Sequence, residues 1–365
     1  MKPIKVAILG VGLIGGSLAL CLKERSACTV YGYDQSEEVI REALKRGVID
    51  QGDTELAPLI QEVDFIFLAV PVGSVVSLLK EIEQITLKPG CIISDVGSTK
   101  GEIAQAGRRL MKKGVSFLGG HPMAGSHRSG VKAAHSLLFE NAYYILTPIP
   151  ETPLADVQRL SNLLETATGA KLVIMDPDHH DRLVGAISHL PHVIAAGLVN
   201  QVGIYNDENE WFLRLAAGGF RDLTRLAASD PVMWRDILLS NRESLLPLLD
   251  DWIKEMKQVR QKISAKDKQW ITRFFSSAQE LRQALPEHKG ILPSTYACTV
   301  IVPDQPGSIG LVASLLGEKK INLRNIGVVN SREEQDGALR LVFYNQEDLE
   351  RGVACLREAN YSVFI

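Results

Sequence analysis

The sequence contains little cysteine, few aromatic residues and no strong excess of charge of either sign. Its 365 residues include five cysteines, 6% aromatic residues and a net charge of -3. The cysteines are odd in number and scattered through mostly apolar stretches. We therefore expect buried thiols in a reducing compartment, and neither a disulfide framework nor a zinc site. Because no basic excess is present to neutralise phosphates, nucleic acid is not expected as a partner.

Long apolar runs are missing as well. No run reaches the length of a membrane-spanning helix, and the N-terminus leads into a strand pattern without the features of a signal peptide. We therefore expect a cytoplasmic protein that does not enter a membrane. With 45% hydrophobic and 23% charged residues, a chain of this length suits two or three ordinary globular domains.

The N-terminal stretch has the pattern of a dinucleotide-binding fold. An apolar strand at 4–9 leads into Gly10-Val11-Gly12-Leu13-Ile14-Gly15 and then into a helix-like segment. The first glycine permits a tight turn, the second lets backbone approach a pyrophosphate, and the third lets helix pack against strand. A second strand, 29–33, ends at Asp34, at the distance expected for an acid that binds the adenosine ribose hydroxyls. No Arg or Lys follows it directly, so NAD is favoured over NADP.

Strands and helices alternate beyond this point, which indicates a doubly wound parallel sheet. The further strands are expected near 64–70, 91–96, 115–118, 141–147 and 171–175. Val70-Pro71 and Gly97-Ser98 end strands at the same edge as the glycine loop and are expected to flank the nicotinamide. The hydroxyl of Ser98 suits a hydrogen bond to His121 or to a substrate hydroxyl, and equally suits a cap for a helix that begins at Thr99.

Residues 119–130 hold four glycines, a proline and two histidines, so they are poor helix and poor strand. We expect a shaped loop there, after the strand 115–118, at the carboxyl edge of the sheet. His121 has an ordinary pKa of about 6.5, so it is mostly neutral near pH 7 and able to accept a proton. Pro122 restricts His121 to an extended backbone. The alternative is a surface turn with an incidental histidine.

The middle of the chain is predicted to be helical, starting at Asp176-Pro177, a cap followed by a first-turn proline. His189 and His192 are three residues apart on one helix face, and Pro191 between them should kink the helix. These two histidines could form the polar wall of a substrate pocket, or they could be core residues whose ring nitrogens are hydrogen-bonded within the protein. A metal site lacks a third ligand.

Gly218-Gly219 should open a further helix, whose first turns place Arg221 and Arg225 on one face. An anion beside them would explain the repeated charge, since guanidinium suits carboxylate binding, although surface salt bridges are the alternative. Trp234 follows in the first turn of the next helix, near the same region or in the core. The predicted helices after Asp176 are more numerous than a single layer covering the sheet requires. We therefore also expect some of them to form a homodimer interface.

Residues 286–293 have the composition of a linker, and the order strand–helix–strand–strand–helix–strand over 294–365 is ferredoxin-like. The strand-to-helix loop from Asp304 to Ile309 exposes N–H groups suited to a small carboxylate ligand. A plain turn that serves only dimer packing is the alternative.

With these motifs assembled, the chain resembles a prephenate dehydrogenase with a C-terminal ACT domain. The resemblance spans almost the whole chain. It rests on the glycine loop at Gly10, Asp-Val-Gly-Ser-Thr-Lys at Asp95, Gly-His-Pro-Met-Ala-Gly-Ser at Gly120, Ser-His-Leu-Pro-His at Ser188, and Gly-Gly-Phe-Arg-Asp-Leu-Thr-Arg at Gly218. It implies an NAD-binding Rossmann domain (1–175), a helical substrate and dimerisation domain (176–285) and an ACT domain (294–365).

The resemblance also implies oxidative decarboxylation of prephenate to 4-hydroxyphenylpyruvate, with NAD as hydride acceptor, on the route to tyrosine. His121 would deprotonate the ring hydroxyl, and Arg225 would bind a substrate carboxylate. The other implied site residues are Ser98, Ser126, His189, His192, Gly218, Arg221 and Trp234, although some relatives have Lys at the position of Arg221. The implied NAD-binding residues are Gly10, Gly12, Leu13, Ile14, Gly15, Asp34, Val70, Pro71 and Ser98. Loss of CO₂ yields an aromatic ring, so orientation, one proton transfer and a hydride acceptor suffice.

An ACT domain implies feedback control by an amino acid, with tyrosine favoured by the pathway. The expected effector site comprises Asp304, Pro306, Gly307, Ser308, Ile309, Asn322 and Leu323. Two rival functions remain open. One is arogenate dehydrogenase, whose substrate differs by an amino group, and the other is a non-catalytic sensor of NAD and amino acids.

Overall fold

The computed structural model describes residues 3–125, 128–284, 296–329 and 336–364. The chain divides into two compact units, Met1–Ala284 and Leu285–Ile365, and each is described by itself.

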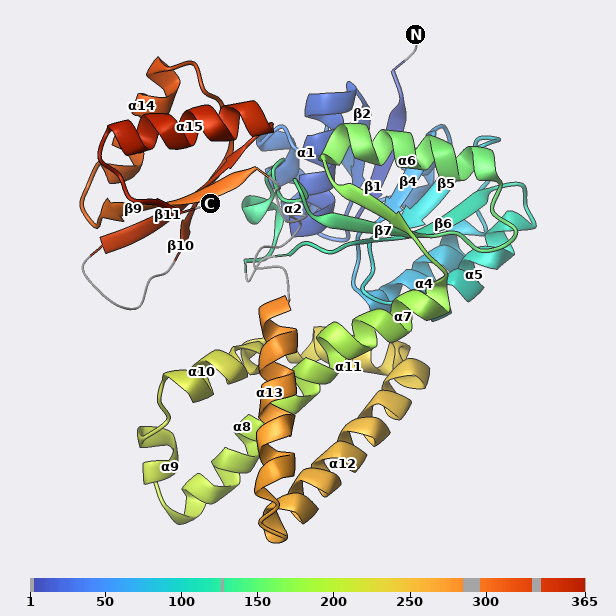
Figure 1. The fold of residues 1–365 in the computed structure, drawn as a ribbon. Helices are drawn as coiled ribbons and strands as arrows, with labels where there is room; N and C mark the ends of the chain where they lie inside the picture. Colours follow the sequence, from blue (N-terminus) through green and yellow to red (C-terminus); the bar gives the residue numbers. More distant parts are fainter. Residues whose placement is uncertain (1–2, 126–127, 285–295, 330–335, 365) are drawn as a thin grey trace. The chain divides into compact units, whose positions relative to one another are not determined.

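The first unit begins with an eight-stranded sheet in the order β3-β2-β1-β4-β5-β6-β7-β8 (Figure 1). The strands are β1 (Lys5–Leu9), β2 (Thr29–Tyr33), β3 (Gln51–Asp53), β4 (Phe65–Leu68), β5 (Ile92–Asp95), β6 (Ser116–Pro122), β7 (Tyr143–Thr147) and β8 (Lys171–Ile174). The central strands are apolar on both sides because helices cover both faces of the sheet. One face carries α1 (Leu13–Ser26), α2 (Glu37–Lys45) and α6 (Leu154–Thr168), and the other carries α3 (Leu56–Ile60), α4 (Val72–Ile82) and α5 (Gly101–Met111).

The predicted doubly wound sheet is confirmed from β3 to β6, where all neighbouring strands pair in parallel. The expectation of a parallel sheet throughout is wrong at its far side, because β7 runs antiparallel to β6. A parallel neighbour needs a long crossover connection, usually a helix. The chain between β6 and β7 contains instead only a short 3₁₀ turn, η1 (Val131–Ala133), in its described part. Strand β3 and helix α3 were not predicted, since both are short and β3 has no apolar run.

The expected loop at 119–130 begins later than the sequence suggests. Gly119 to Pro122 form the second half of β6 and pair with β7, with Gly119 opposite Thr147 and His121 opposite Ile145. A Cβ on Gly119 would lie 2.3 Å from the Thr147 hydroxyl oxygen, and one on Gly120 would lie 2.7 Å from the Asp95 carbonyl oxygen. These two glycines therefore serve the close approach of neighbouring strands and do not form a turn.

The remainder of the first unit is helical (Figure 1). Its elements are α7 (Pro177–Val184), the π-helical turn η2 (Gly185–His189), α8 (Leu190–Glu208), α9 (Trp211–Arg214), α10 (Gly218–Thr224), the 3₁₀ turn η3 (Arg225–Ala228), α11 (Pro231–Ser240), α12 (Arg242–Ser264) and α13 (Lys268–Ala284). The predicted start of α7 is confirmed, since the Asp176 carboxylate accepts the backbone N–H groups of Asp178 (2.9 Å) and His179 (3.1 Å). Asp230 likewise caps α11.

Among the described helices, the continuous stretch Pro177–Glu208 is long and apolar enough to cross a membrane by length and composition. Its first half is not a lipid-facing helix in this unit, because His180, Asp181 and His189 are all buried by neighbouring elements. Farther along, large apolar side chains of α8 and α9 are exposed. They are Ile204, Tyr205, Trp211, Phe212 and Leu213.

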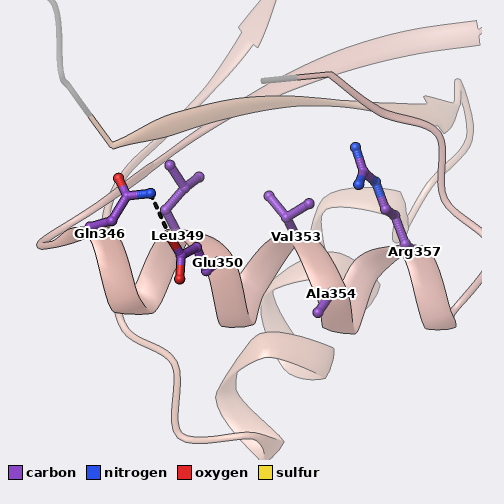
Figure 2. A pocket seen from close by; sticks show the side chains of 6 residues that line it. All are labelled: Gln346, Leu349, Glu350, Val353, Ala354 and Arg357. Carbon is purple, nitrogen blue, oxygen red and sulfur yellow. Dashed lines mark hydrogen bonds between the residues drawn. The ribbon is translucent and has the colours of Figure 1, made fainter.

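The second unit has the predicted order of elements. It contains β9 (Ala297–Pro303), α14 (Ser308–Glu318), β10 (Leu323–Val329), β11 (Asp336–Phe343), α15 (Gln346–Glu358) and β12 (Val363–Phe364). Its antiparallel sheet has the order β10-β11-β9-β12, and both helices pack against it. Figure 2 shows Leu349 and Val353 of α15 pointing to the strand side of the helix, where they join the core of this unit. The expected linker 286–293 lies outside the described residues.

Candidate active site

The glycine loop between β1 and α1 is shaped to receive a phosphate. Gly10 has a positive φ of 99°, and a Cβ there would lie 2.5 Å from the Ala69 carbonyl oxygen. A Cβ on Gly15 would lie 2.0 Å from the Gly10 carbonyl oxygen, so both positions require glycine. Gly12, by contrast, faces open space. The helix that follows has no side-chain cap and no acidic residue in its first turn, so its N–H groups are left for an anion.

Asp34 lies beside this loop in a fixed orientation. Its carboxylate oxygens accept the backbone N–H groups of Val11 (3.1 Å) and Ser36 (3.1 Å). The acid therefore stands at the end of β2 next to the glycine turn, where an adenosine ribose is bound in Rossmann domains. The open space at Gly12 and the placement of Asp34 fit NAD.

The other expected cofactor residues follow strands at the same edge of the sheet. Pro71 is the cap residue of α4, just beyond Val70 in the loop after β4, and Ser98 lies in the loop after β5 and is half-buried. The interpretation of Ser98 as a helix cap is wrong, because α5 begins at Gly101 and Lys100 occupies the cap position. Proximity of Val70, Pro71 and Ser98 to the nicotinamide stays a prediction.

His121 stands near the end of β6 and is connected to the helical part by a chain of hydrogen bonds. Its Nδ1 lies 2.8 Å from Nε2 of His180, whose Nδ1 lies 2.8 Å from a carboxylate oxygen of Asp181. The Asp181 carboxylate also accepts the backbone N–H groups of Lys100 (2.7 Å) and Gly101 (2.8 Å), the start of α5. His180 and Asp181 are almost completely buried.

This chain of contacts determines which nitrogen of each imidazole carries a proton. A carboxylate only accepts, so Nδ1 of His180 donates to Asp181. In neutral His180, Nε2 then has a lone pair and accepts the Nδ1–H of His121. The lone pair of His121 is thereby placed on Nε2, which is available to accept a proton from a ligand.

The surroundings of His121 also keep it neutral. Burial lowers its pKa well below the usual value, and the nearby His180, Lys100 and His189 act in the same direction. Lys100 is itself buried and donates its ammonium to the Asp95 carboxylate and to the Gly120 carbonyl oxygen (2.6 Å). That charge therefore lies one peptide away from His121 and ties the end of β6 to β5.

A second buried histidine lies on the π-helical turn η2. Nδ1 of His189 is 2.8 Å from the side-chain nitrogen of Asn241, which also donates to the Asp181 backbone carbonyl oxygen (2.8 Å). Burial is the main cause that lowers the pKa of His189 to about 4. Its ring makes an edge contact with Trp234, with ring centroids 5.8 Å apart.

Next to it, His192 stacks on Trp234, with ring centroids 3.7 Å apart and an angle of 24°. Nδ1 of His192 donates to the Ser188 carbonyl oxygen at 2.8 Å. Burial lowers the pKa of His192, the hydrogen bond to Ser188 opposes this, and the charge of Arg225 lowers the pKa further. The turn η3, which carries Arg225, packs against α8, which carries His192. The indole nitrogen of Trp234 is buried and has no hydrogen-bond partner among the described residues.

The structure thus brings His189, His192 and Trp234 together, with Arg225 on the turn η3 that packs against α8, and it links His189 to His121 through Asn241, Asp181 and His180. Gly218 and Arg221 lie exposed on α10, and Ser126 lies outside the described residues. Sequence reasoning missed four buried polar residues of this network: His180, Asp181, Lys100 and Asn241. No local pattern distinguishes them, because His180 and Asp181 lie in a polar helical stretch, Lys100 precedes α5 and Asn241 joins two helices.

The fold and the site together define the chain as a dinucleotide-dependent dehydrogenase. Comparison with known proteins makes this specific. Residues 18–174 match the model of the prephenate dehydrogenase nucleotide-binding domain, and residues 176–277 match that of the prephenate dehydrogenase dimerization domain. The chain belongs to the prephenate dehydrogenase family and is an NAD-dependent oxidoreductase.

Individual relatives agree with this assignment. The prephenate dehydrogenase of Bacillus subtilis is 40% identical over 371 residues, covering 100% of this chain and 99% of the relative. The crystal structure of the Aquifex aeolicus prephenate dehydrogenase with hydroxyphenyl propionate and NAD+ is 32% identical with a TM-score of 0.72, covering 78% of this chain and 98% of that one. The Synechocystis arogenate dehydrogenase is 30% identical with a TM-score of 0.68, covering 77% and 99%.

The low pKa of buried His189 should make the fold sensitive to acid. Below pH 6.5 the unfolded chain takes up a proton on this residue, whereas the folded chain resists protonation until about pH 4. The free energy of unfolding should therefore fall as the pH drops through this window, by about 3 kcal/mol from this residue. The change His189→Gln should make the decline shallower in urea unfolding measured from pH 4 to 7.

The matched control is His179→Gln, the same change on the exposed face of α7. It should leave the pH dependence of the wild type intact. If the free energy of unfolding depends on pH equally in the wild type and in the His189 variant, the lowered pKa of His189 is contradicted.

Proposed function

We propose that the chain oxidises prephenate to 4-hydroxyphenylpyruvate and CO₂ while NAD is reduced to NADH. The observation that carries this proposal is the lone pair of His121 Nε2, fixed by His180 and Asp181, at the carboxyl edge of the NAD-binding sheet. When bound, NAD accepts a hydride from the carbon that bears the ring hydroxyl. The names of the relatives from Bacillus subtilis and Aquifex aeolicus support the same substrate.

In this mechanism, His121 Nε2 takes the proton of the ring hydroxyl as the hydride leaves that carbon. The ring carboxylate then departs as CO₂, and its bonding electrons enter the ring and move to the new carbonyl oxygen. His121 returns the proton to this oxygen, which becomes the phenol of the product. Asp181 and His180 hold the imidazole in the tautomer that allows both transfers.

His121→Asn should reduce kcat for prephenate at least about 100-fold, because a general base contributes that much or more. Substrate should still bind, since the anchoring charge lies elsewhere. In the wild type, the acid limb of kcat/KM should lie below pH 6.5, because neutral His121 is the active form and its pKa is lowered. NADH absorbance with prephenate, and in parallel with arogenate, measures these quantities and distinguishes the two substrates.

The exposed His135 provides the control, and His135→Asn should retain the wild-type kcat. A near-normal kcat for the His121 variant would remove this residue from the mechanism. An absence of NADH formation by the wild type with either substrate would favour the sensor alternative.

We propose that Arg225 binds a carboxylate of the substrate. It is exposed on η3, and its charge acts on His192, which stacks on Trp234. Prephenate is a dianion, and guanidinium is the side chain suited to bidentate carboxylate contacts. His192, Trp234, Gly218 and the neighbouring Arg221 would line the same region, with Ser98 and Ser126 near the ring hydroxyl.

Arg225→Gln should chiefly raise KM for prephenate, because the charge attracts the ground state and the transition state alike. The same change at Arg182, an exposed arginine of α7, should leave KM unaltered. Initial rates over a range of prephenate concentrations separate the two parameters. An unchanged KM for the Arg225 variant would refute its role.

We further propose that the chain forms a homodimer through its helical part and acts in the cytoplasm. The dimerization-domain match and the exposed apolar residues of α8 and α9 support the homodimer.

The cysteines support the cytoplasmic location. All five are buried free thiols, which fits a reducing compartment. In four of them (Cys21, Cys28, Cys91 and Cys298), burial raises the pKa to about 11 or 12.

For the second unit we propose an ACT domain that binds tyrosine. Gly307, with a φ of 96°, ends the loop from Asp304 and exposes the N-terminus of α14, while Ser308 closes the loop by donating to the Pro303 carbonyl oxygen (2.7 Å). The second expected segment, Asn322 and Leu323, is at the other end of the sheet. Leu323 pairs at the Phe343 end of β11, and Pro303 pairs at its Asp336 end. A site built from both segments therefore needs two copies of the unit.

Titration of the full chain with tyrosine in a calorimeter should release heat. Gly307→Ala should weaken binding, because the loop needs a positive φ that alanine adopts poorly. Gly317→Ala, at a helical position facing open space, should bind like the wild type. No heat with tyrosine, phenylalanine or tryptophan would count against this role.

A further inference from the structure

Asn241 is the least expected member of the buried network. It forms the single-residue junction between α11 and α12 and is only 2% exposed. Its backbone is satisfied by these helices, since its N–H donates to the Ile237 carbonyl oxygen (3.0 Å) and its carbonyl oxygen accepts from Leu245 N–H (3.0 Å). The side-chain amide is thus left to other partners.

Those partners fix the orientation of the amide. The atom facing the Asp181 backbone carbonyl oxygen must be the nitrogen, because a carbonyl oxygen only accepts. The same nitrogen faces Nδ1 of His189 at 2.8 Å, and an NH₂ group only donates. Nδ1 of His189 must therefore accept, and the proton of the neutral ring is on Nε2.

We propose that Asn241 is a positioning residue that holds His189 as the Nε2–H tautomer, so that His189 serves the site as a hydrogen-bond donor to an oxygen of the substrate. The role of His189 as a donor to the substrate rests on the proposed function, whereas the tautomer of His189 does not. The rings of His189 and His192 both contact Trp234, and η3, which carries Arg225, packs against α8, which carries His192. The donor therefore belongs to the same group of side chains as the proposed anion-binding arginine.

Asp181 thus gives two histidines opposite roles, the half-buried His121 and the buried His189. The Asp181 carboxylate, through His180, leaves a lone pair on His121 Nε2. The Asp181 backbone carbonyl, through Asn241, leaves a proton on His189 Nε2. Neither ring needs a charge for its role, which suits their lowered pKa values.

The charged and titratable groups that act on His189 define what a change at Asn241 should do. Burial lowers its pKa, His180 and His192 add to the lowering, and Asp181 opposes it. A carboxylate at position 241 would add a second opposing charge in direct contact with Nδ1. It should raise the pKa of His189, and in the neutral ring it should attract the proton to Nδ1 and leave Nε2 without one.

The test uses the full chain with ¹⁵N-labelled histidine, in the wild type, Asn241→Asp and Asn241→Ser. The signal of His189 is identified by its loss in His189→Gln. In the wild type at pH 7, Nδ1 should have the shift of an unprotonated nitrogen and Nε2 that of a protonated one. In Asn241→Asp, Nδ1 should become protonated, and in Asn241→Ser, whose shorter side chain offers one donor, both tautomers should appear. Asn345→Asp, at the cap of α15 in the other unit, is the matched control and should leave the His189 signal unchanged.

Kinetics provide the second readout. Asn241→Asp should lower kcat/KM for prephenate about 10-fold or more at pH 8, since a lost hydrogen bond at a buried polar group has that effect. The loss should shrink as the pH falls and protonated His189 regains its Nε2–H, a trend opposite to the acid limb of His121. Activity of Asn345→Asp should equal that of the wild type.

Three results would overturn the inference. These are a wild-type His189 protonated on Nδ1, a tautomer that the Asn241 variants do not alter, and an altered tautomer with unchanged kcat/KM at every pH. A wild-type chain that does not oxidise prephenate would refute the proposed function and the donor role, while the tautomer is still decided by the spectra.

Discussion

The structure around the candidate active site depends on one carboxylate, that of Asp181. It accepts three N–H donors: two backbone groups at the start of α5 and the ring of His180. Since α5 belongs to the nucleotide-binding part and α7 to the helical part, this one side chain joins the two. A buried carboxylate is costly unless it is fully hydrogen-bonded, and three donors meet that requirement. The same contacts that stabilise the charge therefore fix the position of His180, and through it the ring of His121.

A buried ion pair, Lys100 with Asp95, lies next to this carboxylate. The Lys100 ammonium donates to Asp95, and the remaining capacity of the Asp95 carboxylate is used by backbone N–H groups of Gly97 (2.8 Å) and Gly120 (3.3 Å). Buried ion pairs add little net stability when compared with apolar packing, but removing one partner leaves an uncompensated charge. The pair is thus better explained by what it positions, the peptide before His121, than by what it contributes to folding.

Much of this could be predicted from the sequence. Several local signals predict the structure correctly: the glycine turn at Gly10, the cap at Asp176 and the element order of the second unit all follow from short patterns. The failure at 119–120 has a different cause. The glycines at 119 and 120 resemble a loop because their reason for being glycine, the contacts with Thr147 and Asp95, lies in residues distant along the chain.

The same limit applies to the site. His121 was found because an unusual motif surrounds it, whereas His180, Asp181 and Asn241 stand in ordinary helical sequence. Only the fold brings them together, from α7 and from the junction of α11 and α12. Pattern reasoning therefore identifies the residues that face a ligand more readily than those that orient them. The orienting residues nevertheless determine the chemistry. The imidazoles of His121 and His189 have the same intrinsic pKa, and they become an acceptor and a donor only through their hydrogen-bond partners, His180 and Asn241.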